Sequence, residues 1–473
     1  MNTYYDSQAA AAADRVAAAA ITELLGTECA IRIGGSGYHV VVVKAPAGAG
    51  KSYFIGSVID AITQNSRRGP IAAIGTPTNA QAQTLVATLA RRLPTIDFAY
   101  VPKKGLSLPP ADATLGNVHT VAAADAHAYP VTIGTLDKLG DANSRGNLQR
   151  YRYLLIDEAY QAHSGHYFGV AGLAERHLLV GDPGQLDPFT TMEDADRWRG
   201  LDEDPTQTAV GVLLRHHPQL KPLAMPITRR LPASALEIAR SFYPGHSFTS
   251  WTRPDTRRMR LSTLAGPARA GDLSSRSTQA LDHTWDLAAR TGWGYVRLPE
   301  TPVLTADPLT IDVISGLLER GQTRGIELSS EATDGEWTPL RHGRIAVAVS
   351  HNDQKDLLTA TLSNHGIEGV VVDTANKLQG LEFDLLVAWH PLAGLPEADG
   401  FHLDPGRLCV MLTRHRHACI VVGRASDAAL VGDLPPASDA WLGYDIDPEV
   451  DGWFAQQLVF NQLEPHAVDL LGV

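Results

Sequence analysis

The chain has 473 residues, which suggests about two or three domains, and 44% hydrophobic with 19% charged residues is an ordinary globular composition. The formal net charge of −12 argues against binding nucleic acid through a broad basic face. It leaves room for a narrow basic channel, because local charge decides local binding. No apolar run is long enough to span a bilayer, so we expect no membrane partner. Three cysteines give no disulfide framework and fit a reducing cytoplasm.

The first predicted element is an Ala-rich helix from about Ser7, an acceptable N-cap, to about Leu25. Two strands, "CAIRI" and "HVVVVKAP", should follow on either side of the Gly-rich turn "GGSG". The pattern strand, turn, helix then occurs in "APAGAGKSYFIGSVIDAI" and again in "GPIAAIGTPTNAQAQTLVATLARRL". "YRYLLIDEA" and "RHLLVGDPGQ" are two more short apolar strands. Short apolar strands alternating with helices predict a parallel sheet covered on both faces.

The same alternation returns in the C-terminal half, in "RIAVAVSHNDQKDLLTATLSNHG", "EGVVVDTANKLQGLEFDLLVAWH" and "GRLCVMLTRHRHACIVVG". We therefore predict an α/β fold with two domains, residues 1–245 and 246–473. Domain one should carry a small insertion around 98–145. Domain two should open on a divider region with few strand signals and one clear helix, "LTIDVISGLLERG", and should end in an acidic tail.

A phosphate-binding loop is predicted by "APAGAGKS", which fits the Walker A pattern except that Ala45 replaces the leading glycine. A Gly-rich loop between a strand and a helix turns successive backbone N–H groups toward a phosphate. Lys51 would reach the β- and γ-phosphates, and the Ser52 hydroxyl would bind Mg²⁺. The rest of the nucleotide-binding loop would be Ala47, Gly48, Ala49 and Gly50.

Two adjacent carboxylates end the apolar strand "LLIDEA". Asp157 would hold Mg²⁺, directly or through water, and Glu158 would orient and deprotonate the attacking water. The alternative to a catalytic role is that Asp157 and Glu158 are acidic residues in the first turn of a helix, where such residues are common. The Walker A pattern upstream decides against it. Together the two motifs predict an ATP or GTP hydrolase of the P-loop type.

Further motifs carry a family resemblance. "DEAYQ" followed by "GDPGQLDPF" resembles motifs II and III of superfamily 1 helicases, in particular the Upf-like branch (superfamily 1B). "TPTNAQAQTL" matches motif Ia, and "ITRRLPASALEIARSFYPG" resembles the motif IV region. "VVDTANKLQGLEFD" resembles motif V, and "RLCVMLTRHRHACIVVG" resembles motif VI. The motifs follow the family's order and cover most of the chain.

The resemblance implies two RecA-like domains in tandem, with ATP in the cleft between them. Gln185 would sense the γ-phosphate, and Arg230 and Arg414 would act as arginine fingers. From motif V, Gly380 and Glu382 would lie at the γ-phosphate and ribose side of the nucleotide. The backbone of the nucleic acid would be contacted by Thr76, Thr78 and Thr374.

Three of these assignments have open alternatives. For Arg230 the alternatives are that Arg229 is the finger or that Arg230 is a surface residue, and for Arg414 the alternative is a solvated helix charge within "TRHRH". Gln8, in "YYDSQAAA", is compatible with an adenine-reading Q motif or with a helix-capping segment.

The leading hypothesis is an ATP- and Mg²⁺-dependent helicase or translocase on single-stranded DNA or RNA, moving 5′ to 3′ as the branch implies. A nucleic-acid-stimulated ATPase switch that remodels a complex is the second, motivated by the acidic balance and the small insertions. A scaffold that binds nucleotide without hydrolysis is the third, and the complete set of motif residues argues against it. A protein partner would supply specificity. The sequence does not decide between DNA and RNA, nor the pathway.

Overall fold

The chain forms two compact units in the computed structural model. The N-terminal unit comprises residues 10–183 and 187–227, and the C-terminal unit comprises residues 1–9, 184–186 and 228–473. The structure describes residues 4–26, 31–33, 36–66, 69–186, 198, 201, 204, 206–262, 273–301, 306–435 and 448–470. Gly34 and Gly35 of the predicted turn "GGSG", the end of motif III after Leu186, and residues 436–447 and 471–473 of the predicted tail lie outside these residues.

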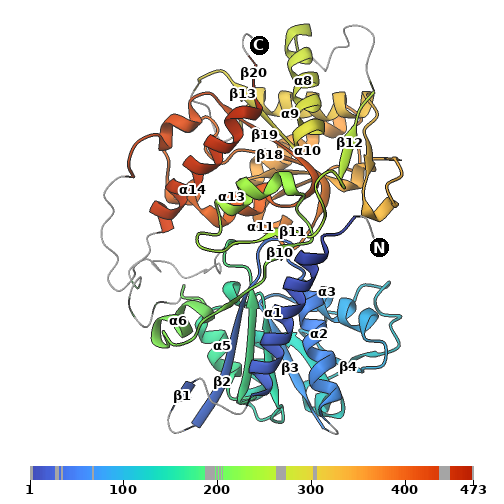
Figure 1. Ribbon diagram of the computed structural model, residues 1–473, viewed down its shortest axis with the longest axis vertical. Coiled ribbons are helices and arrows are strands. Elements are labelled where there is room, and N and C mark those ends of the chain that lie inside the picture. The colour runs from blue at the N-terminus through green and yellow to red at the C-terminus, as the bar shows by residue number, and fades with distance from the viewer. Residues whose placement is uncertain are drawn as a thin grey trace. The chain divides into compact units, whose positions relative to one another are not determined.

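A nine-stranded sheet runs through the N-terminal unit (Figure 1). Its strand order is β1-β2-β8-β7-β3-β6-β4-β5, with β9 paired to β2. Its pairs are parallel except for the β1–β2 hairpin. The strands are β1 (Ile31–Ile33), β2 (Ser36–Lys44), β3 (Ala72–Thr76), β4 (Phe98–Val101), β5 (Val118–Thr120), β6 (Val131–Thr135), β7 (Tyr153–Asp157), β8 (Arg176–Gly181) and β9 (Leu223–Ala224).

Helices cover both faces of this sheet, as expected for buried apolar parallel strands. One hydrophobic core cluster contains Val41 and Val43 on one face of β2. It packs that face against α1 (Ser7–Leu25), α2 (Lys51–Gln64) and α3 (Asn79–Arg92). A second cluster joins the other face to α4 (Leu136–Ser144), α5 (Ser164–Ala171) and α6 (Ala209–His216). The 3₁₀ turns are η1 (Ala123–Ala128) and η2 (Ala159–Gln161).

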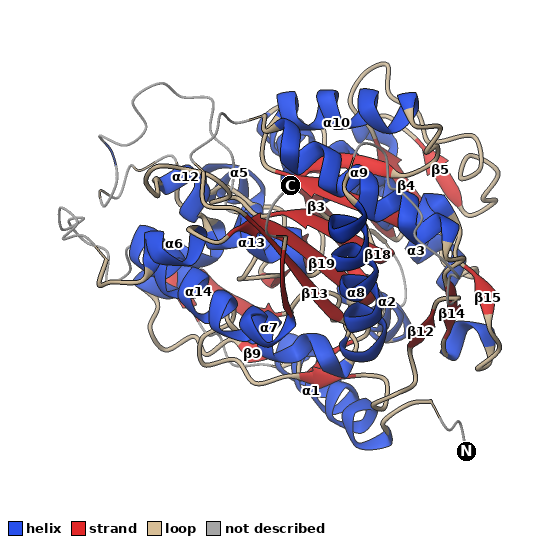
Figure 2. Cartoon of the chain, turned by 90° about the horizontal axis from the view of Figure 1, so that it is seen from above, coloured by secondary structure: helices blue, strands red, loops and turns tan. Residues whose placement is uncertain are grey.

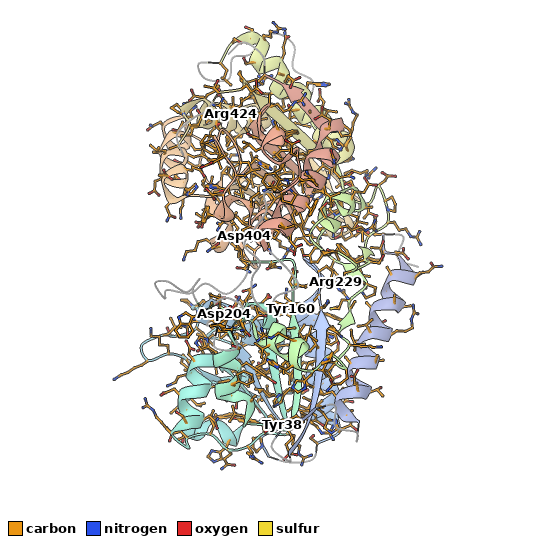
Figure 3. The ribbon with its side chains drawn as sticks, turned by 90° about the vertical axis from the view of Figure 1, so that its left-hand side faces the viewer. Tyr38, Tyr160, Asp204, Arg229, Asp404 and Arg424 are labelled. Carbon is orange, nitrogen blue, oxygen red and sulfur yellow. The ribbon has the colours of Figure 1, made fainter. Side chains whose placement is uncertain are left out.

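The register of the strands places the predicted motifs along one edge. Asp157 pairs with Val180, and Lys44, the last residue of β2, pairs with Gly181, so β2, β7 and β8 end side by side. Further along the same edge Thr76 pairs with Thr135, and Gly134 pairs with Val101. Figure 3 shows Tyr160, just after β7, at this end of the sheet and Tyr38, near the start of β2, at the other. The carboxyl edge of this sheet therefore carries motifs I, Ia and II.

The C-terminal unit has its own parallel sheet of six strands, in the order β17-β16-β18-β19-β13-β20. Its strands are β13 (Trp293–Leu298), β16 (Ile345–Val349), β17 (Val371–Thr374), β18 (Phe383–Trp389), β19 (His415–Arg424) and β20 (Ala467–Asp469). A small antiparallel sheet lies beside it, with β12 (Arg258–Arg260), β14 (Glu327–Ser329) and β15 (Thr338–Pro339). Two short strands, β10 (Ile227–Thr228) and β11 (Thr249–Ser250), pair with each other.

The helices of the C-terminal unit lie on both faces of its sheet (Figure 2). One apolar cluster joins the sheet to α8 (Ser275–Thr291), α9 (Pro308–Thr323) and α10 (Asn352–Asn364). From the other side α13 (Pro405–Leu412) contacts β18, and α14 (Pro448–Leu463) contacts β13. The remaining helices and turns are η4 (Ala233–Ala235), α7 (Leu236–Arg240), η5 (Glu331–Thr333), η6 (His342–Arg344), α11 (Ala375–Leu378), α12 (Gly400–Leu403), η7 (Asp427–Val431) and η8 (Glu464–His466).

These two parallel sheets flanked by helices confirm the predicted fold class. Two stretches differ from expectation in their content. The supposed divider region supplies α8 and the interior strand β13 in addition to the expected helix α9. Residues 98–145, expected as an insertion, supply β4, β5, β6 and α4. The domain boundary near residue 245 stays a prediction.

Candidate nucleotide-binding site

The Walker A segment forms a tight loop between β2 and α2. Gly48 and Gly50 have φ values of 71° and 90°, in the left-handed region that favours glycine. Ala45 has no such backbone, and its N–H donates to the carbonyl of Gly181 at 2.8 Å. The glycine missing from the leading position is therefore not required by the conformation of this loop. Lys51 is the first residue of α2, so the loop ends at a helix N-terminus, where anions bind.

Lys51 and Glu158 form an ion pair, with 3.2 Å between Nζ and Oε1, and each side chain is 13% exposed. Burial alone would lower the pKa of Lys51, but Glu158, Asp182 and Asp157 outweigh it and raise that pKa. Burial, with the Glu158 carboxylate beside it, raises the pKa of Asp157. Lys51 of the Walker A segment therefore lies among three carboxylates, those of Asp157, Glu158 and Asp182. Asp182, which is 1% exposed, is a member that the motif analysis did not single out.

Glu158 has a left-handed backbone, with φ 54° and ψ 45°. This conformation costs a residue other than glycine about 1–3 kcal/mol and occurs preferentially at functional sites. It places the two carboxylates of Asp157 and Glu158 at the end of β7, before the chain turns into η2. The backbone strain at Glu158 is therefore an indication of a functional role that is independent of the sequence motif.

The oxygen atoms at this site fit a magnesium ion and a phosphate. Asp157 Oδ1 and Glu158 Oε2 are buried and make no hydrogen bond among the described residues. Buried polar atoms without partners are unfavourable, so these oxygens suit a cation or a water molecule. Carboxylate and hydroxyl oxygens are what Mg²⁺ prefers, and Asp157 and Ser52 offer one of each. The predicted pair of magnesium ligands is chemically sound.

Arg414 has the chemistry of a phosphate-binding residue. It immediately precedes β19, is only 1% exposed, and its Nε and Nη2 make no hydrogen bond among the described residues. A buried guanidinium without an acceptor is costly and is satisfied by an anion with two oxygens. The alternative of a solvated helix charge does not fit a side chain this buried.

Arg230 is also buried, but it belongs to a network of charges in the C-terminal unit. Its Nε lies 3.6 Å from Glu382 Oε2. Arg416 binds both Glu382 (3.2 Å) and Glu331 (2.6 Å). Burial favours a raised pKa for Glu382, but Arg230, Arg416 and Arg344 hold that pKa below its usual value. Glu382 is therefore an ionised acceptor that already engages the candidate finger.

Arg257 fixes the backbone on which Arg230 stands. Its guanidinium donates to the carbonyl of Arg229 at 2.8 Å and to that of Arg230, and it pairs with Glu331 at 2.6 Å. Arg257 and Glu331 belong to no motif quoted above, so motif analysis could not single them out. The side chain of Arg229 stacks on the ring of Trp251, 3.9 Å from its centroid, which leaves Arg230 as the better finger candidate.

The other predicted residues of the C-terminal unit lie at separate places. Gln185 accepts a hydrogen bond from Gln379 at 3.2 Å, one residue before Gly380, which has φ 83°. Thr374 ends β17 and pairs with Val349, at the carboxyl edge of the sheet. Glu382 precedes β18 at the amino edge. Motif V therefore spans the sheet, with its threonine and its glutamate at opposite edges.

The predicted nucleic-acid contacts of motif Ia differ in accessibility. Thr76 is fully buried, and its hydroxyl donates to the carbonyl of Thr78 at 3.0 Å. Thr78 is exposed and caps α3 in a capping box with Gln81. Gln81 Nε2 also donates to Gln161 Oε1 at 3.1 Å, which links motif Ia to motif II. Thr78 is the residue that a ligand can reach.

Gln8 lies in a helix-capping segment. Asp6 accepts hydrogen bonds from the N–H groups of Gln8 (2.8 Å) and Ala9 (3.2 Å), so Asp6 caps α1 and Ser7 is its first residue. The expectation that Ser7 is the N-cap is wrong by one position. Gln8 itself is exposed, and the capping interpretation accounts for the segment.

Comparisons with known proteins match segments of both units. Two family models, each described as an AAA domain, match residues 27–191 and 314–426. The Regulator of nonsense transcripts 1 homolog of Arabidopsis thaliana is 23% identical over 293 residues, which are 60% of this chain and 20% of that protein. The chain thus spans about a fifth of the length of this curated relative.

Two solved helicase structures overlap the chain more loosely. The PRRSV helicase covers 87% of this chain and 54% of its own, with 13% identity and a TM-score of 0.39. Arterivirus nonstructural protein 10 (helicase) in complex with DNA covers 83% and 62%, with 14% identity and a TM-score of 0.41. The fold class assigned above stands on the sheet topology of the chain itself.

The two AAA-domain matches and the curated relative make this chain similar to P-loop NTPases. Within that class it resembles the Upf-like branch of superfamily 1, and the matches confirm the resemblance predicted from the motifs. The predicted enzyme class, ATP hydrolases of the helicase type, agrees with the resemblance to the curated relative and with the AAA-domain matches. None of the described helices is long and apolar enough to cross a membrane.

Proposed function

We propose that the chain is an ATP-dependent helicase or translocase that moves 5′ to 3′ on single-stranded DNA or RNA. One observation carries the proposal: Lys51 and Glu158 are 3.2 Å apart beside the buried Asp157, with carboxylate oxygens that make no hydrogen bond within the described residues. That arrangement suits a nucleotide phosphate, a divalent cation and a water molecule. The cytoplasmic location stays a prediction that rests on the cysteine count.

The residues of the N-terminal unit have distinct roles in this proposal. With nucleotide bound, Lys51 would contact the β- and γ-phosphates, and Ser52 with Asp157 would hold Mg²⁺, which would supply positive charge to the phosphates. Glu158, freed from Lys51, orients the attacking water and accepts its proton. In the Lys51–Glu158 pair the proposed base and the phosphate ligand neutralise each other's charge.

The arginines of the C-terminal unit would act on the transferred phosphoryl group. Arg414 carries donors that lack an acceptor among the described residues, and Arg230 is held by Glu382. Guanidinium groups stabilise the charge that spreads over the phosphoryl oxygens in the transition state, which contributes a factor of roughly 10³–10⁵ in rate. We assign Arg414 the larger share, since it has no carboxylate to leave. Gln185 senses the γ-phosphate, and Thr78 and Thr374 contact the nucleic acid.

Steady-state ATPase assays with and without poly-dT or poly-U test the proposal. We expect hydrolysis that Mg²⁺ removal abolishes and that at least one polymer stimulates. Glu158→Gln should lower kcat by roughly 10²–10⁴ while keeping ATP affinity, because the phosphate ligands remain. Glu175→Gln, an exposed carboxylate of the same unit, is the matched control. Normal cycling of Glu158→Gln would remove Glu158 as the general base, and no hydrolysis by the unmodified chain would refute the whole proposal.

A strand-displacement assay separates the helicase from the ATPase switch. Both predict stimulation by nucleic acid, but only the helicase predicts ATP-dependent release of a strand from a duplex with a 5′ single-stranded extension. Release from a 3′ extension only would contradict the direction. Stimulated hydrolysis without release from either substrate would favour the switch.

A further inference from the structure

A cavity of about 220 Å³ lies within the C-terminal unit, and none of the predicted site residues lines it. Its charged lining residues are Arg253, Arg257, Arg290 and Asp255, so three cations face one carboxylate. This local excess of positive charge runs against the net charge of −12 of the whole chain and attracts anions. The carbonyl end of α8 also lies here, but its partial negative charge is smaller than the full charge of Arg290 in the same turn. The charge of the lining therefore favours an anion.

The lining also includes a buried histidine whose ring makes no hydrogen bond. The side chain of His417 is 4% exposed, and Asp384 Oδ1 lies 3.8 Å from its Nδ1, which is beyond hydrogen-bond distance. Neither ring nitrogen has a hydrogen-bond partner among the described residues. Burial lowers the pKa of His417 to about 4, so at neutral pH the ring carries one donor and one acceptor. Since buried polar atoms without partners are unfavourable, this ring is suited to a polar ligand in the cavity.

Defined backbone presents the two exposed arginines of the cavity, Arg253 and Arg290. Arg290 lies in the last turn of α8, which Gly292 ends with φ 81°, and it forms no ion pair with any described residue. Arg253 is anchored by a 3.0 Å hydrogen bond from its backbone N–H to the carbonyl of Tyr4. Its Nε donates to the carbonyl of Tyr5 at 3.2 Å. Both side chains therefore have guanidinium nitrogens left to bind a ligand.

The size and the donors of the cavity indicate which anion it suits. Sites for ordinary small-molecule ligands have volumes of about 300–1,000 Å³, so this smaller cavity suits a compact oxyanion rather than a whole nucleotide. Guanidinium groups bind both carboxylates and phosphates through paired hydrogen bonds. A carboxylate has two oxygens in one plane, whereas phosphate directs four oxygens to the corners of a tetrahedron. Phosphate can therefore engage donors that come from separate elements, those of Arg253, Arg290 and His417.

Arg257 connects this cavity to the candidate arginine finger. It lines the cavity, donates to the carbonyl of Arg230 and pairs with Glu331 at 2.6 Å. An anion in the cavity would compete with Glu331 for Arg257. Glu331 would then keep only Arg416, and Arg416 would be drawn from Glu382. Glu382 would be left with Arg230, 3.6 Å away, as its main partner and would hold that side chain more firmly.

We propose that this cavity is a regulatory site for inorganic phosphate, and that phosphate bound there slows ATP hydrolysis by restraining Arg230. Phosphate is a product of the proposed reaction, so the site would lower turnover when the product accumulates. The binding of phosphate is independent of the proposed function, whereas the effect on hydrolysis rests on it.

Equilibrium dialysis of radiolabelled phosphate against the full chain tests the binding. Saturating Mg²⁺ and a non-hydrolysable ATP analogue are present, so that phosphate does not occupy the candidate nucleotide site. Arg290→Ala should weaken binding about tenfold, because it removes hydrogen bonds from a charged donor. Arg276→Ala is the matched control, since Arg276 is an exposed arginine of the same helix that does not line the cavity, and it should bind phosphate like the unmodified chain.

Three results of the dialysis would overturn the inference: no phosphate bound by the unmodified chain, unchanged binding in Arg290→Ala, or an equal loss in Arg276→Ala. Succinate is the further competitor, because it carries two carboxylates and no phosphate. If succinate displaced phosphate at a lower concentration than unlabelled phosphate does, the cavity would be a carboxylate site, which also contradicts the inference.

Steady-state kinetics with phosphate at constant ionic strength test the regulation. At saturating ATP we expect phosphate to lower kcat about fivefold, at the lower end of ordinary allosteric couplings. Arg290→Ala should hydrolyse ATP normally without phosphate and should lose this inhibition, whereas Arg276→Ala should keep it. Inhibition that persists in Arg290→Ala would arise at the nucleotide site, and phosphate binding without a fall in kcat would remove the regulatory role. If the unmodified chain hydrolysed no ATP, the proposed function would fail, and the dialysis would still decide whether the cavity binds phosphate.

Discussion

The two parallel sheets of this protein use opposite edges for their candidate chemistry. In the N-terminal unit the residues follow strands: Asp157 ends β7, and the phosphate loop follows β2. In the C-terminal unit the charged candidates precede strands, Glu382 before β18 and Arg414 before β19, whereas Thr374 ends β17. Ligands of open α/β sheets bind beyond the carboxyl ends of strands, and the charged candidates of the second unit depart from that rule. A shared architecture thus supports two kinds of site.

The two edges also differ in how their charges are satisfied. At the first, Lys51 and Glu158 satisfy each other only in part, and buried carboxylate oxygens lack partners among the described residues. At the second, a network from Arg257 through Glu331, Arg416 and Glu382 to Arg230 satisfies most groups, and Arg414 stands apart with bare donors. We infer that the first edge is suited to bind a ligand. The second edge holds Arg230 in a network of ion pairs, whereas Arg414 keeps donors that make no hydrogen bond among the described residues.

We expect Arg414→Ala to have the largest effect on ATP hydrolysis. If this variant kept its activity, the contrast between the two sheet edges would be wrong. We expect kcat for ATP to fall by about 10³, with little change in KM, because the donors act on charge that develops in the transition state. Arg416→Ala is the comparison variant, since Arg416 serves carboxylates instead, and its kcat should fall by less than about tenfold. Equal losses in both, measured by steady-state kinetics, would mean that the amino edge acts only as a scaffold.

Glu331→Gln tests the scaffold itself. The Glu331 and Arg257 side chains are 7% and 1% exposed, and removing one partner of such a pair costs about 3 kcal/mol. The midpoint of urea unfolding of the C-terminal unit should fall accordingly. Glu327→Gln removes a carboxylate from an exposed pair with Arg260 and should cost about 0.5 kcal/mol or less. A neutral Glu331→Gln would show that the network contributes no stability.

The pH dependence of the free energy of unfolding also tests the contribution of Glu331 to the network. Burial favours a raised pKa for Glu331, but Arg257 and Arg416 outweigh it and hold that pKa below the ordinary 4.5. The folded state therefore favours the ionised form, so the contribution is complete above about pH 4.5 and is lost as pH falls through the lowered value. Urea midpoints of the unmodified chain and of Glu331→Gln should converge below pH 4.5. A difference that widens on acidification would reverse the assignment.

Gln81→Leu has the smallest expected effect. Gln81 joins Thr78 to Gln161, so its loss removes hydrogen bonds worth about 1 kcal/mol between motifs Ia and II. Stimulation of ATP hydrolysis by poly-dT or poly-U should fall about fivefold while hydrolysis without polymer is unchanged. Gln64→Leu, whose amide bonds only within α2, is the control. A parallel fall in unstimulated hydrolysis would point to a disturbed site instead.

Local patterns predicted the strands that end on motifs, because apolar runs and turn residues lie close together in sequence. They predicted β7 before Asp157 and α2 after the phosphate loop. They missed β13, since "WGYVRL" mixes a glycine and a charge into a short strand that tertiary packing buries. The role of Arg257 was out of reach, because its partner Glu331 is 74 residues away and only the folded chain joins them.

The backbone of Glu158 has a consequence for how this protein can change over generations. A left-handed backbone is adopted most easily by glycine or asparagine, so Glu158→Gly should relieve about 1 kcal/mol of backbone strain, but it also removes the proposed base and the ion-pair partner of Lys51. Backbone strain and the chemistry of the site therefore favour different residues at this position. A descendant that kept the fold but no longer needed hydrolysis would be free to lose its glutamate here first.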